Sequence, residues 1–281
     1  MSGDNPDTVF RRIISERKVM RLKDKIAVIV GGGSGMGAAV ARLFAKQGAS
    51  VIVGDIDEDA ASKVVKSITD TISSARAINR KVDVTDKGSV ERLAQFIRDE
   101  MGPADILVNT FGIAAFVPML ELSFDTWRST IDVNLTGTFL TCRAIGRQMV
   151  EQQRGKIINV GSTASFSGVP GMVHYTAAKH GVLGLTRALA VEWGKYNIHV
   201  NCICPGATTT PLMLSSTTEP WRADRKKRIP TGRLSSPENQ AHVALFLASA
   251  ESDNLSGAGI PTDGGVHAMA AATSNDALAS N

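Results

Sequence analysis

Short apolar runs alternate with longer amphipathic stretches along most of the chain, beginning at Lys25. The runs are rich in β-branched residues, and the stretches between them are long enough for helices, which is typical of βαβ units around a parallel sheet. Nearly continuous apolar character indicates strands that are covered on both faces. The pattern predicts seven strands, at Ile26–Val30, Ser50–Asp55, Ala77–Asp83, Ile106–Asn109, Lys156–Gly161, Ile198–Ile203 and Gly259–Thr262.

No linker rich in Pro, Gly or Ser divides the 281 residues, and no internal repeat is present. We therefore predict the α/β class, with a single doubly wound Rossmann domain over residues 23–268 whose seven-stranded parallel sheet is flanked by helices. Residues 1–22 are expected to form an N-terminal extension with a short helix begun near Asp7. Residues 269–281 are small and polar and are expected to form a flexible tail.

Composition and charge exclude several classes of protein. Hydrophobic residues make up 43% and charged residues 21% of the chain, as in ordinary globular proteins. The formal charge of +4 is modest and the basic residues are scattered except between Arg222 and Arg228, so no nucleic-acid partner is expected. No apolar run reaches the roughly 18 residues of a membrane span, and no signal peptide opens the chain. We expect a cytoplasmic protein without a membrane partner.

The three cysteines, Cys142, Cys202 and Cys204, cannot all pair with one another. Cys202 and Cys204 flank one residue of a predicted buried strand, and we interpret all three as reduced core thiols. No further Cys or His lies near them at ligand spacing, so no metal site is expected.

A glycine-rich turn joins the first predicted strand to an amphipathic helix, Gly35–Gln47. In this context Gly31 permits a sharp turn, Gly35 lets backbone amides approach a pyrophosphate at the helix N-terminus, and Gly37 permits close packing of helix on strand. The turn predicts a dinucleotide site with contacts from Gly31, Ser34, Gly35, Met36 and Gly37.

Asp55 ends the second predicted strand, at the spacing expected for the acid that binds the adenosine ribose hydroxyls. A carboxylate there repels a ribose 2′-phosphate, and no basic residue precedes Gly35 or follows Asp55 to offset it. These residues favour NAD(H) as the cofactor over NADP(H). The alternative is that Asp55 only starts the turn before the helix at Asp57. Further contacts are expected from Ile56, from Asp83 and Val84 at the adenine, and from Asn109 and Gly112 at the crevice.

Tyr175 and Lys179 are four residues apart in a helical stretch and therefore share one face. Bringing a tyrosine from a pKa of about 10 to about 7 requires roughly 4 kcal/mol. A cation about 4 Å away at an effective dielectric near 20 supplies roughly that amount. We therefore predict that Tyr175 transfers the proton as general acid and base and that the Lys179 ammonium stabilises its phenolate.

Two further polar residues extend this pair. Ser162 follows a strand at the edge where open α/β sheets bind ligands, so its hydroxyl is expected to bond the substrate oxygen. Asn134, a poor helix former on the preceding long helix, is expected to hold a water that links Lys179 to solvent. Each residue alone has an ordinary alternative: Ser162 as a helix cap, Lys179 as a solvated charge, Asn134 at a kink and Tyr175 as a half-buried aromatic.

Taken together, these motifs resemble the compact, NAD-type branch of the short-chain dehydrogenase/reductase family from about Leu22 to Ala268. The matching positions are Gly31-x3-Gly35-x-Gly37, Asp83, Asn109 to Gly112, Asn134, Ser162, Tyr175-x3-Lys179, Asn201, Pro205-Gly206 and Asp263-Gly264-Gly265. The chain departs from the family pattern at Val30, Thr110, Phe111 and Gly161.

The resemblance implies a catalytic tetrad of Asn134, Ser162, Tyr175 and Lys179, with Tyr175 and Lys179 also at the nicotinamide ribose. It implies that Pro205, Gly206, Thr208 and Thr210 orient the carboxamide. It also implies a homotetramer assembled through the helices that hold Asn134 and Tyr175. Enoyl reductases of this fold space the tyrosine and lysine more widely, so the spacing here favours alcohol and ketone chemistry.

The predicted function is NAD(H)-dependent interconversion of a secondary alcohol and a ketone on a largely apolar substrate, alicyclic, aromatic or steroid-like. The expected pocket residues are Phe116, Phe166, Met172, Leu212, Met213 and Trp221, under a mobile lid from Thr210 to Arg233. The five basic residues between Arg222 and Arg228 either attract an acidic substrate or form a solvated helix face, which we prefer. Two alternatives remain open, an NADP(H)-dependent carbonyl or 3-oxoacyl reductase and a non-catalytic NAD-binding regulator.

Overall fold

The computed structural model describes residues 20–269 and contains one sheet of seven parallel strands in the order β3-β2-β1-β4-β5-β6-β7. The predicted fold class is therefore confirmed. The order changes direction between β1 and β4, so the crevice at the carboxyl ends of these strands is the expected ligand position. The strands are β1 Ile26–Val30, β2 Ser50–Asp55, β3 Ala77–Lys81, β4 Ile106–Asn109, β5 Gly155–Val160, β6 Ile198–Pro205 and β7 Gly259–Thr262.

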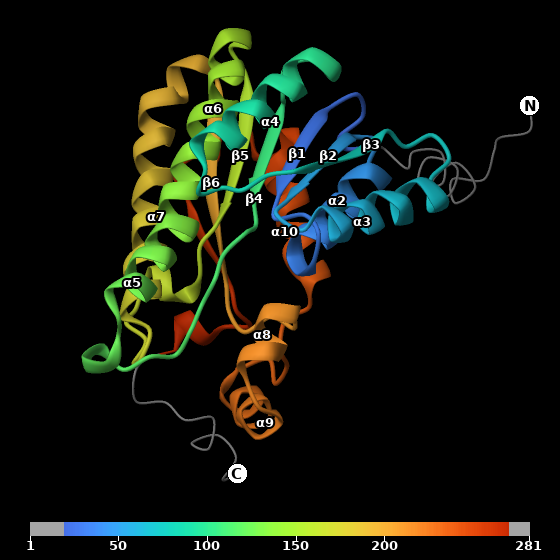
Figure 1. The fold of residues 1–281 in the computed structure, drawn as a ribbon. Helices are drawn as coiled ribbons and strands as arrows, with labels where there is room; N and C mark the ends of the chain where they lie inside the picture. Colours follow the sequence, from blue (N-terminus) through green and yellow to red (C-terminus); the bar gives the residue numbers. More distant parts are fainter. Residues whose placement is uncertain (1–19, 270–281) are drawn as a thin grey trace, which may run out of the picture.

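Helices cover both faces of the sheet (Figure 1). One face is covered by α2 Gly35–Lys46, α3 Glu58–Thr71 and α10 Pro237–Ala248. The other is covered by α4 Lys87–Glu100, α6 Gly137–Gln152 and α7 Val173–Trp193. The α5 helix, Phe124–Ile131, lies beside the start of α7.

The alternation of side chains along a strand explains why β1 is apolar throughout. Ile29 packs into the cluster with Phe44 of α2, whereas its neighbour Val28 packs into the opposite cluster with Ile145 of α6. Both faces of the strand are thus buried, and any polar side chain inside it would lose its hydration.

The predicted boundaries of three strands were wrong by one or two residues. The third strand ends at Lys81 and not at Asp83, because Asp83 turns back and accepts hydrogen bonds from the amide and hydroxyl of Thr85 at 2.9 and 2.7 Å. The fifth strand is shifted by one residue, and the sixth continues to Pro205. The first predicted helix ends at Lys46, one residue early.

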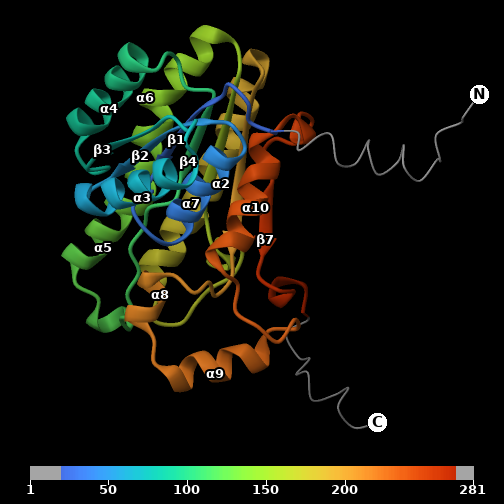
Figure 2. The same ribbon diagram turned by 90° about the vertical axis from the view of Figure 1, so that its right-hand side faces the viewer.

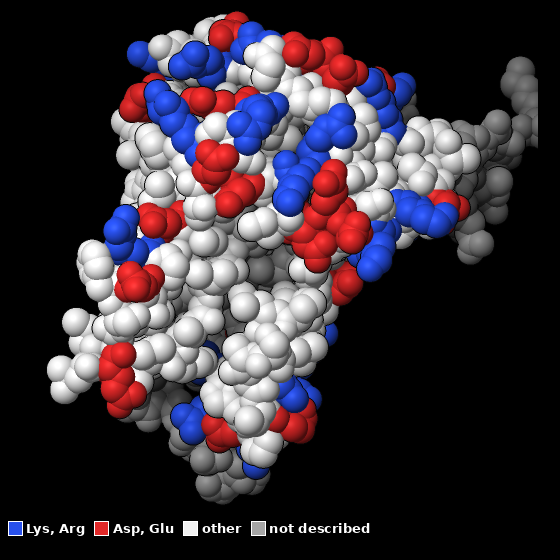
Figure 3. Space-filling model, viewed as in Figure 1, with Lys and Arg blue, Asp and Glu red and all other residues white. Residues whose placement is uncertain are grey.

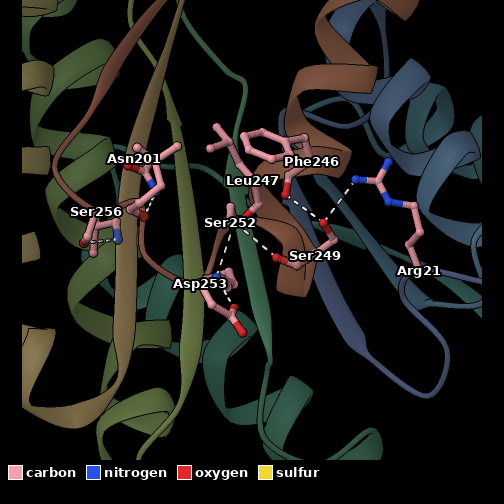
Figure 4. Close-up of polar contacts among 11 residues, drawn as sticks. Arg21, Asn201, Phe246, Leu247, Ser249, Ser252, Asp253 and Ser256 are labelled. Carbon is pink, nitrogen blue, oxygen red and sulfur yellow. Dashed lines mark hydrogen bonds and ion pairs between the residues drawn. The ribbon is translucent and has the colours of Figure 1, made fainter.

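The lead-in to β1 is fastened to the end of α10 (Figure 4). Arg21 donates a hydrogen bond to the Ser249 hydroxyl at 3.1 Å, and Ser249 donates to the carbonyl of Phe246 at 2.8 Å. Arg21 also forms an ion pair with Glu251. The predicted helix near Asp7 and nearly all of the predicted tail lie outside the described residues.

The predicted lid forms two short helices below the carboxyl ends of the strands, α8 Pro211–Ser216 and α9 Glu219–Arg228 (Figures 1 and 2). Each has a proline in its first turn, and the caps Thr210 and Thr218 accept from Met213 and Trp221. Within residues 20–269, no helix is both long and apolar enough to span a bilayer.

Candidate active site

A cavity of about 850 Å³ lies between the carboxyl ends of the strands and the α8–α9 segment. In Figure 3 the surface is hollowed where this segment meets the body. The cavity is large enough for a small ligand together with part of a cofactor. Ten predicted site residues line it, namely Met36, Gly112, Asn134, Ser162, Tyr175, Lys179, Pro205, Gly206, Thr208 and Thr210.

Tyr175 and Lys179 lie one turn apart on α7, as predicted. The Lys179 Nζ atom lies 5.6 Å from the centre of the Tyr175 ring and donates a hydrogen bond to the carbonyl of Val160 at 2.8 Å. Only 3% of Lys179 is exposed, which excludes the solvated-charge alternative. Burial lowers the pKa of Lys179 to about 8, partly opposed by the sulfurs of Cys202 and Cys204.

The direction of the pKa shift at Tyr175 differs from the expectation. Burial raises the pKa of the Tyr175 hydroxyl, and a hydrogen bond with Ser162 opposes that rise. The expected pKa included the attraction between Lys179 and the phenolate. It did not include most of the free energy that is lost when the phenolate is taken out of water. In the protein alone, desolvation is the larger effect.

Ser162 is both a cap and a member of the pocket wall. It follows β5 in extended conformation, and its hydroxyl oxygen accepts a hydrogen bond from the Ala164 amide at 3.1 Å. This bond occupies a lone pair and leaves the hydroxyl proton free to donate. A capping serine can therefore still bond a substrate oxygen.

Ser165 is a site residue that the sequence argument missed. Its hydroxyl accepts from the Ser162 amide at 3.2 Å and donates to the carbonyl of Lys179 at 2.9 Å. Ser165 is 3% exposed, so these bonds are shielded from water. It joins the strand end that holds Ser162 to the helix that holds Lys179. The spacing Ser162-x-x-Ser165, which is that of a capping box, was the available signal.

Asn134 lies in a π-helical turn, Asp132–Thr136, between α5 and α6, and not in regular helix as predicted. Its side-chain amide donates to the carbonyls of Ile113 and Thr130, both at 3.0 Å. Its Oδ1 atom is buried and has no partner among residues 20–269. π-Helical turns are frequent at functional sites because they re-aim one side chain.

Gly112 lies between Asn134 and Lys179. A Cβ atom on Gly112 would be 2.6 Å from Asn134 Oδ1 and 3.5 Å from Lys179 Nζ. Both polar atoms therefore face the space that the glycine leaves open. A buried acceptor and a buried ammonium beside such a space are suitable partners for an ordered water, as the sequence argument expected.

The glycine turn has the geometry that dinucleotide binding requires. Gly31 and Gly35 have φ values of +79° and +50°, in the left-handed region. A Cβ atom on Gly37 would lie 2.2 Å from the carbonyl oxygen of Gly31, so only glycine allows the helix to pack this closely. The backbone amides at the start of α2 are thus open to an anion.

Asp55 is held beside this turn by two backbone amides, Gly33 at 2.8 Å and Asp57 at 3.0 Å. These bonds fix the carboxylate at the end of β2. The bond from Asp57 also shows that Asp55 starts the turn before α3, which was the alternative interpretation of this residue. Ile56 beside it is 62% exposed. The glycine turn, the fixed carboxylate and the cavity together fit a nicotinamide dinucleotide.

Several predicted cofactor residues lie outside the cavity lining. Gly31, Ser34, Gly35 and Gly37 belong to the glycine turn, and Asp55, Ile56, Asp83 and Val84 follow β2 and β3 towards the sheet edge. The side chain of Asn109 is buried and donates to Asn159 Oδ1 at 2.9 Å, behind the site. Asn109 therefore joins β4 to β5.

Five of the six expected pocket residues line the cavity, and Phe166 does not. Phe166 packs against the small cluster of Leu183, Cys202 and Cys204. The centroid of its ring lies 4.6 Å from that of His267, with the two ring planes tilted by 38°. His267 takes the place in the lining that was predicted for Phe166. All three cysteines are buried and unbonded, as predicted.

The comparisons with known proteins agree with this arrangement. A family model described as "Enoyl-(Acyl carrier protein) reductase" matches residues 31–267. The chain is 38% identical over 245 residues to the D-threitol dehydrogenase of Mycolicibacterium smegmatis, which covers 87% of this chain and 94% of that protein. It is 37% identical over 248 residues to the NAD-dependent glycerol dehydrogenase of Listeria innocua, with coverages of 88% and 96%.

A solved structure extends the likeness to three dimensions. The gluconate 5-dehydrogenase of Burkholderia cenocepacia, in complex with NADP and tartrate, superposes with a TM-score of 0.85 at 31% identity and covers 90% of this chain and 98% of that one. The fold and site define a Rossmann-type oxidoreductase. The chain belongs to the short-chain dehydrogenase/reductase family.

Proposed function

We propose that the protein is an NAD(H)-dependent oxidoreductase that interconverts a secondary alcohol and a ketone on a largely apolar substrate. The observation that carries the proposal is that one cavity beside the glycine turn is lined by Asn134 of the π-helical turn, Ser162 after β5, and Tyr175 and Lys179 of α7. Because the Lys179 Nζ atom lies 5.6 Å from the centre of the Tyr175 ring and Ser162 lowers the pKa of the Tyr175 hydroxyl against the rise that burial causes, a proton donor and acceptor stands next to a fixed charge.

In the proposed oxidation, Ser162 donates a hydrogen bond to the substrate oxygen while Tyr175 accepts the alcohol proton. The Lys179 ammonium offsets the cost of desolvating the phenolate, and it can release a proton to a water in the space beside Gly112, where Asn134 Oδ1 would accept a hydrogen bond from that water. The bound nicotinamide supplies the hydride acceptor and, when oxidised, a further positive charge. Reduction of the ketone runs through the same groups in reverse, with Tyr175 as the acid.

The preference for NAD(H) rests on Asp55, whose carboxylate is held at the end of β2 by the amides of Gly33 and Asp57 and would repel a ribose 2′-phosphate bound there. We expect the wild-type protein to have a kcat/KM for NAD⁺ at least about 10-fold higher than for NADP⁺, and Asp55→Ser to reduce that ratio. Steady-state kinetics with both cofactors and a panel of alicyclic secondary alcohols provides the measurement. A clear preference for NADP⁺ would instead support the runner-up, a carbonyl or 3-oxoacyl reductase.

The name of the matching family model suggests a second candidate, reduction of an enoyl thioester. The four-residue spacing of Tyr175 and Lys179 favours the alcohol reaction, since it places the ammonium one helical turn from the phenol. Including a crotonyl thioester among the test substrates distinguishes the two. If the protein turned over this thioester and none of the alcohols or ketones, enoyl reduction would replace the proposed reaction.

We also propose a cytoplasmic homotetramer. The outward face of α7 presents small or apolar residues, among them Ala177, Gly184, Ala188 and Val191, of which Val191 is 86% exposed. Such a face is suited to packing against a second copy. Light scattering that gave the mass of one 29.8 kDa chain would contradict the tetramer.

The proposed cytoplasmic location is supported by the three thiols, which form no disulfide and fit a reducing compartment.

A further inference from the structure

The α9 helix carries a run of basic residues, and the structure separates one of them from the rest. Arg222 donates to Glu219 at 2.9 Å and to the carbonyl of Thr217 at 2.6 Å. Arg228 forms an ion pair with Asp224 at 2.9 Å, and Lys226 is exposed. Within this helix, Arg225 is the basic residue that lines the cavity. The solvated-face interpretation therefore holds for most of the run and fails for Arg225.

The surroundings of Arg225 leave its charge unmatched. Arg225 is half-buried as a residue, and its guanidinium forms no hydrogen bond or ion pair within residues 20–269. The described residues that line the cavity include no aspartate or glutamate, and on α8 and α9 they are Leu212, Met213, Ser216, Trp221 and Arg225 itself. An arginine stays charged in such a place, and partial removal from water without a partner raises its free energy.

The position of Arg225 places this charge away from the reacting groups. Lys179 is the other lysine or arginine in the described lining, and it is committed to Val160 and Tyr175. The α9 helix lies farther from the sheet than α8 (Figure 2). A ligand that reaches from Tyr175 to Arg225 thus passes apolar side chains before it meets the second cation.

We propose that Arg225 forms an anion-binding subsite, so that the substrate carries a carboxylate or phosphate at the end opposite its carbinol or carbonyl carbon. This inference rests on the proposed function and makes its substrate class narrower. A planar guanidinium binds either anion through two parallel hydrogen bonds, which are strong in a partly buried site. The apolar wall around Leu212 and Trp221 would hold the body of the molecule between the two polar ends.

Matched ketones test the subsite by kinetics. The probes are 4-oxocyclohexane-1-carboxylate, its neutral methyl ester and 4-oxocyclohexyl phosphate. We expect Arg225→Gln to lower the ratio of kcat/KM for each anionic probe to that for the ester by about 10- to 100-fold. Lys226→Gln removes the same charge from the same helix outside the cavity and should leave the ratio unchanged. An unchanged ratio in Arg225→Gln would overturn the proposal. The anionic probe whose kcat/KM falls more, the carboxylate or the phosphate, identifies the anion that Arg225 binds better.

Equilibrium binding separates this inference from the proposed reaction. Calorimetry on Tyr175→Phe with saturating NADH measures affinity for the carboxylate and the ester without turnover. Tighter binding of the carboxylate that is lost in Tyr175→Phe/Arg225→Gln supports the subsite even if no ketone is reduced by the wild type. Equal affinity for both probes contradicts the subsite, as does a loss of NADH affinity in Arg225→Gln before any probe is added, since Arg225 would then serve the cofactor.

Discussion

Burial sets the protonation of the catalytic pair at the scale of single residues. It raises the pKa of Tyr175 and lowers that of Lys179 to about 8, so both shifts oppose the charged forms. With a pKa of about 8 the Lys179 ammonium stays mostly charged at neutral pH, whereas the Tyr175 phenolate requires further positive charge nearby. The protein therefore holds a neutral tyrosine until a ligand and cofactor enter. Ser162 therefore has to be positioned beside the Tyr175 hydroxyl before the ligand and the cofactor bind.

A second buried group of α7, His174, makes stability depend on pH. His174 is fully buried, neither ring nitrogen has a partner in residues 20–269, and burial lowers its pKa. As pH falls below the unfolded value of about 6.5, the unfolded chain takes up the proton first, so stability is present above that pH and declines below it. We expect His174→Phe to lose less stability than the wild type between pH 7.5 and 5.5.

Urea unfolding at a fixed protein concentration measures this difference. His242→Gln, which changes an exposed histidine of α10, serves as the control and should keep the wild-type dependence on pH. The pKa of His199 is also lowered by burial, so the dependence should become weaker in His174→Phe without vanishing. An unchanged slope in His174→Phe would show that this histidine does not contribute.

At the scale of elements, Ser165 determines how β5 and α7 are joined. Ser165→Ala removes a hydrogen bond to the Ser162 amide and one to the Lys179 carbonyl. We expect kcat to fall about 10-fold while KM changes little, because the loss of roughly one kcal/mol of positioning acts on the proton transfer more than on binding. Measured kcat and KM for one ketone decide the matter.

Ser252→Ala is the matched control for that variant. Ser252 is a buried serine whose hydroxyl bonds the carbonyls of Leu247 and Ser249 at 2.9 and 3.1 Å and accepts from Lys156 Nζ at 3.3 Å, and it is not part of the cavity lining (Figure 4). It should lower stability by a similar amount and leave kcat unchanged. If both variants lost the same activity, Ser165 would be structural only.

Gly112→Ala tests the space between the π-helical turn and α7. The new Cβ atom would lie 2.6 Å from Asn134 Oδ1, so Asn134 must move or the water position must close. We expect kcat to fall at least about 10-fold. Gly194→Ala, where nothing lies within 4 Å of the added Cβ, should stay fully active. Full activity of Gly112→Ala would contradict the relay through Asn134.

The sequence predicted those elements whose pattern is local. The five central strands were found because both of their faces are buried, and the glycine turn because φ and close packing restrict its residues. The edge strands β3 and β7 are only partly buried. The π-helical turn at Asn134 was not predicted, since one inserted residue hardly changes the apolar period. The order of Phe166 and His267 at the cavity depends on packing between distant segments, which no local pattern contains.

At the scale of the whole molecule, the strand order explains why the site forms where it does. The sheet changes direction between β1 and β4, so the chain leaves a crevice there for the glycine turn and for the residues after β4, β5 and β6. The α8–α9 segment then covers the crevice from below (Figure 1). The tetrad could be predicted from motifs, whereas the position of Arg225 in the cavity lining, without a partner in residues 20–269, required the folded chain.

The most direct test of the central claim follows the hydride itself. Secondary alcohols deuterated at the carbinol carbon are mixed with NAD⁺ and either the wild type or Tyr175→Phe, and the label in the reduced nicotinamide is measured by mass spectrometry. The wild type should transfer deuterium, and Tyr175→Phe should do so about 100- to 10,000-fold more slowly while still binding NAD⁺. Transfer at the wild-type rate by Tyr175→Phe, or no transfer by the wild type from any alcohol, would contradict the proposed function.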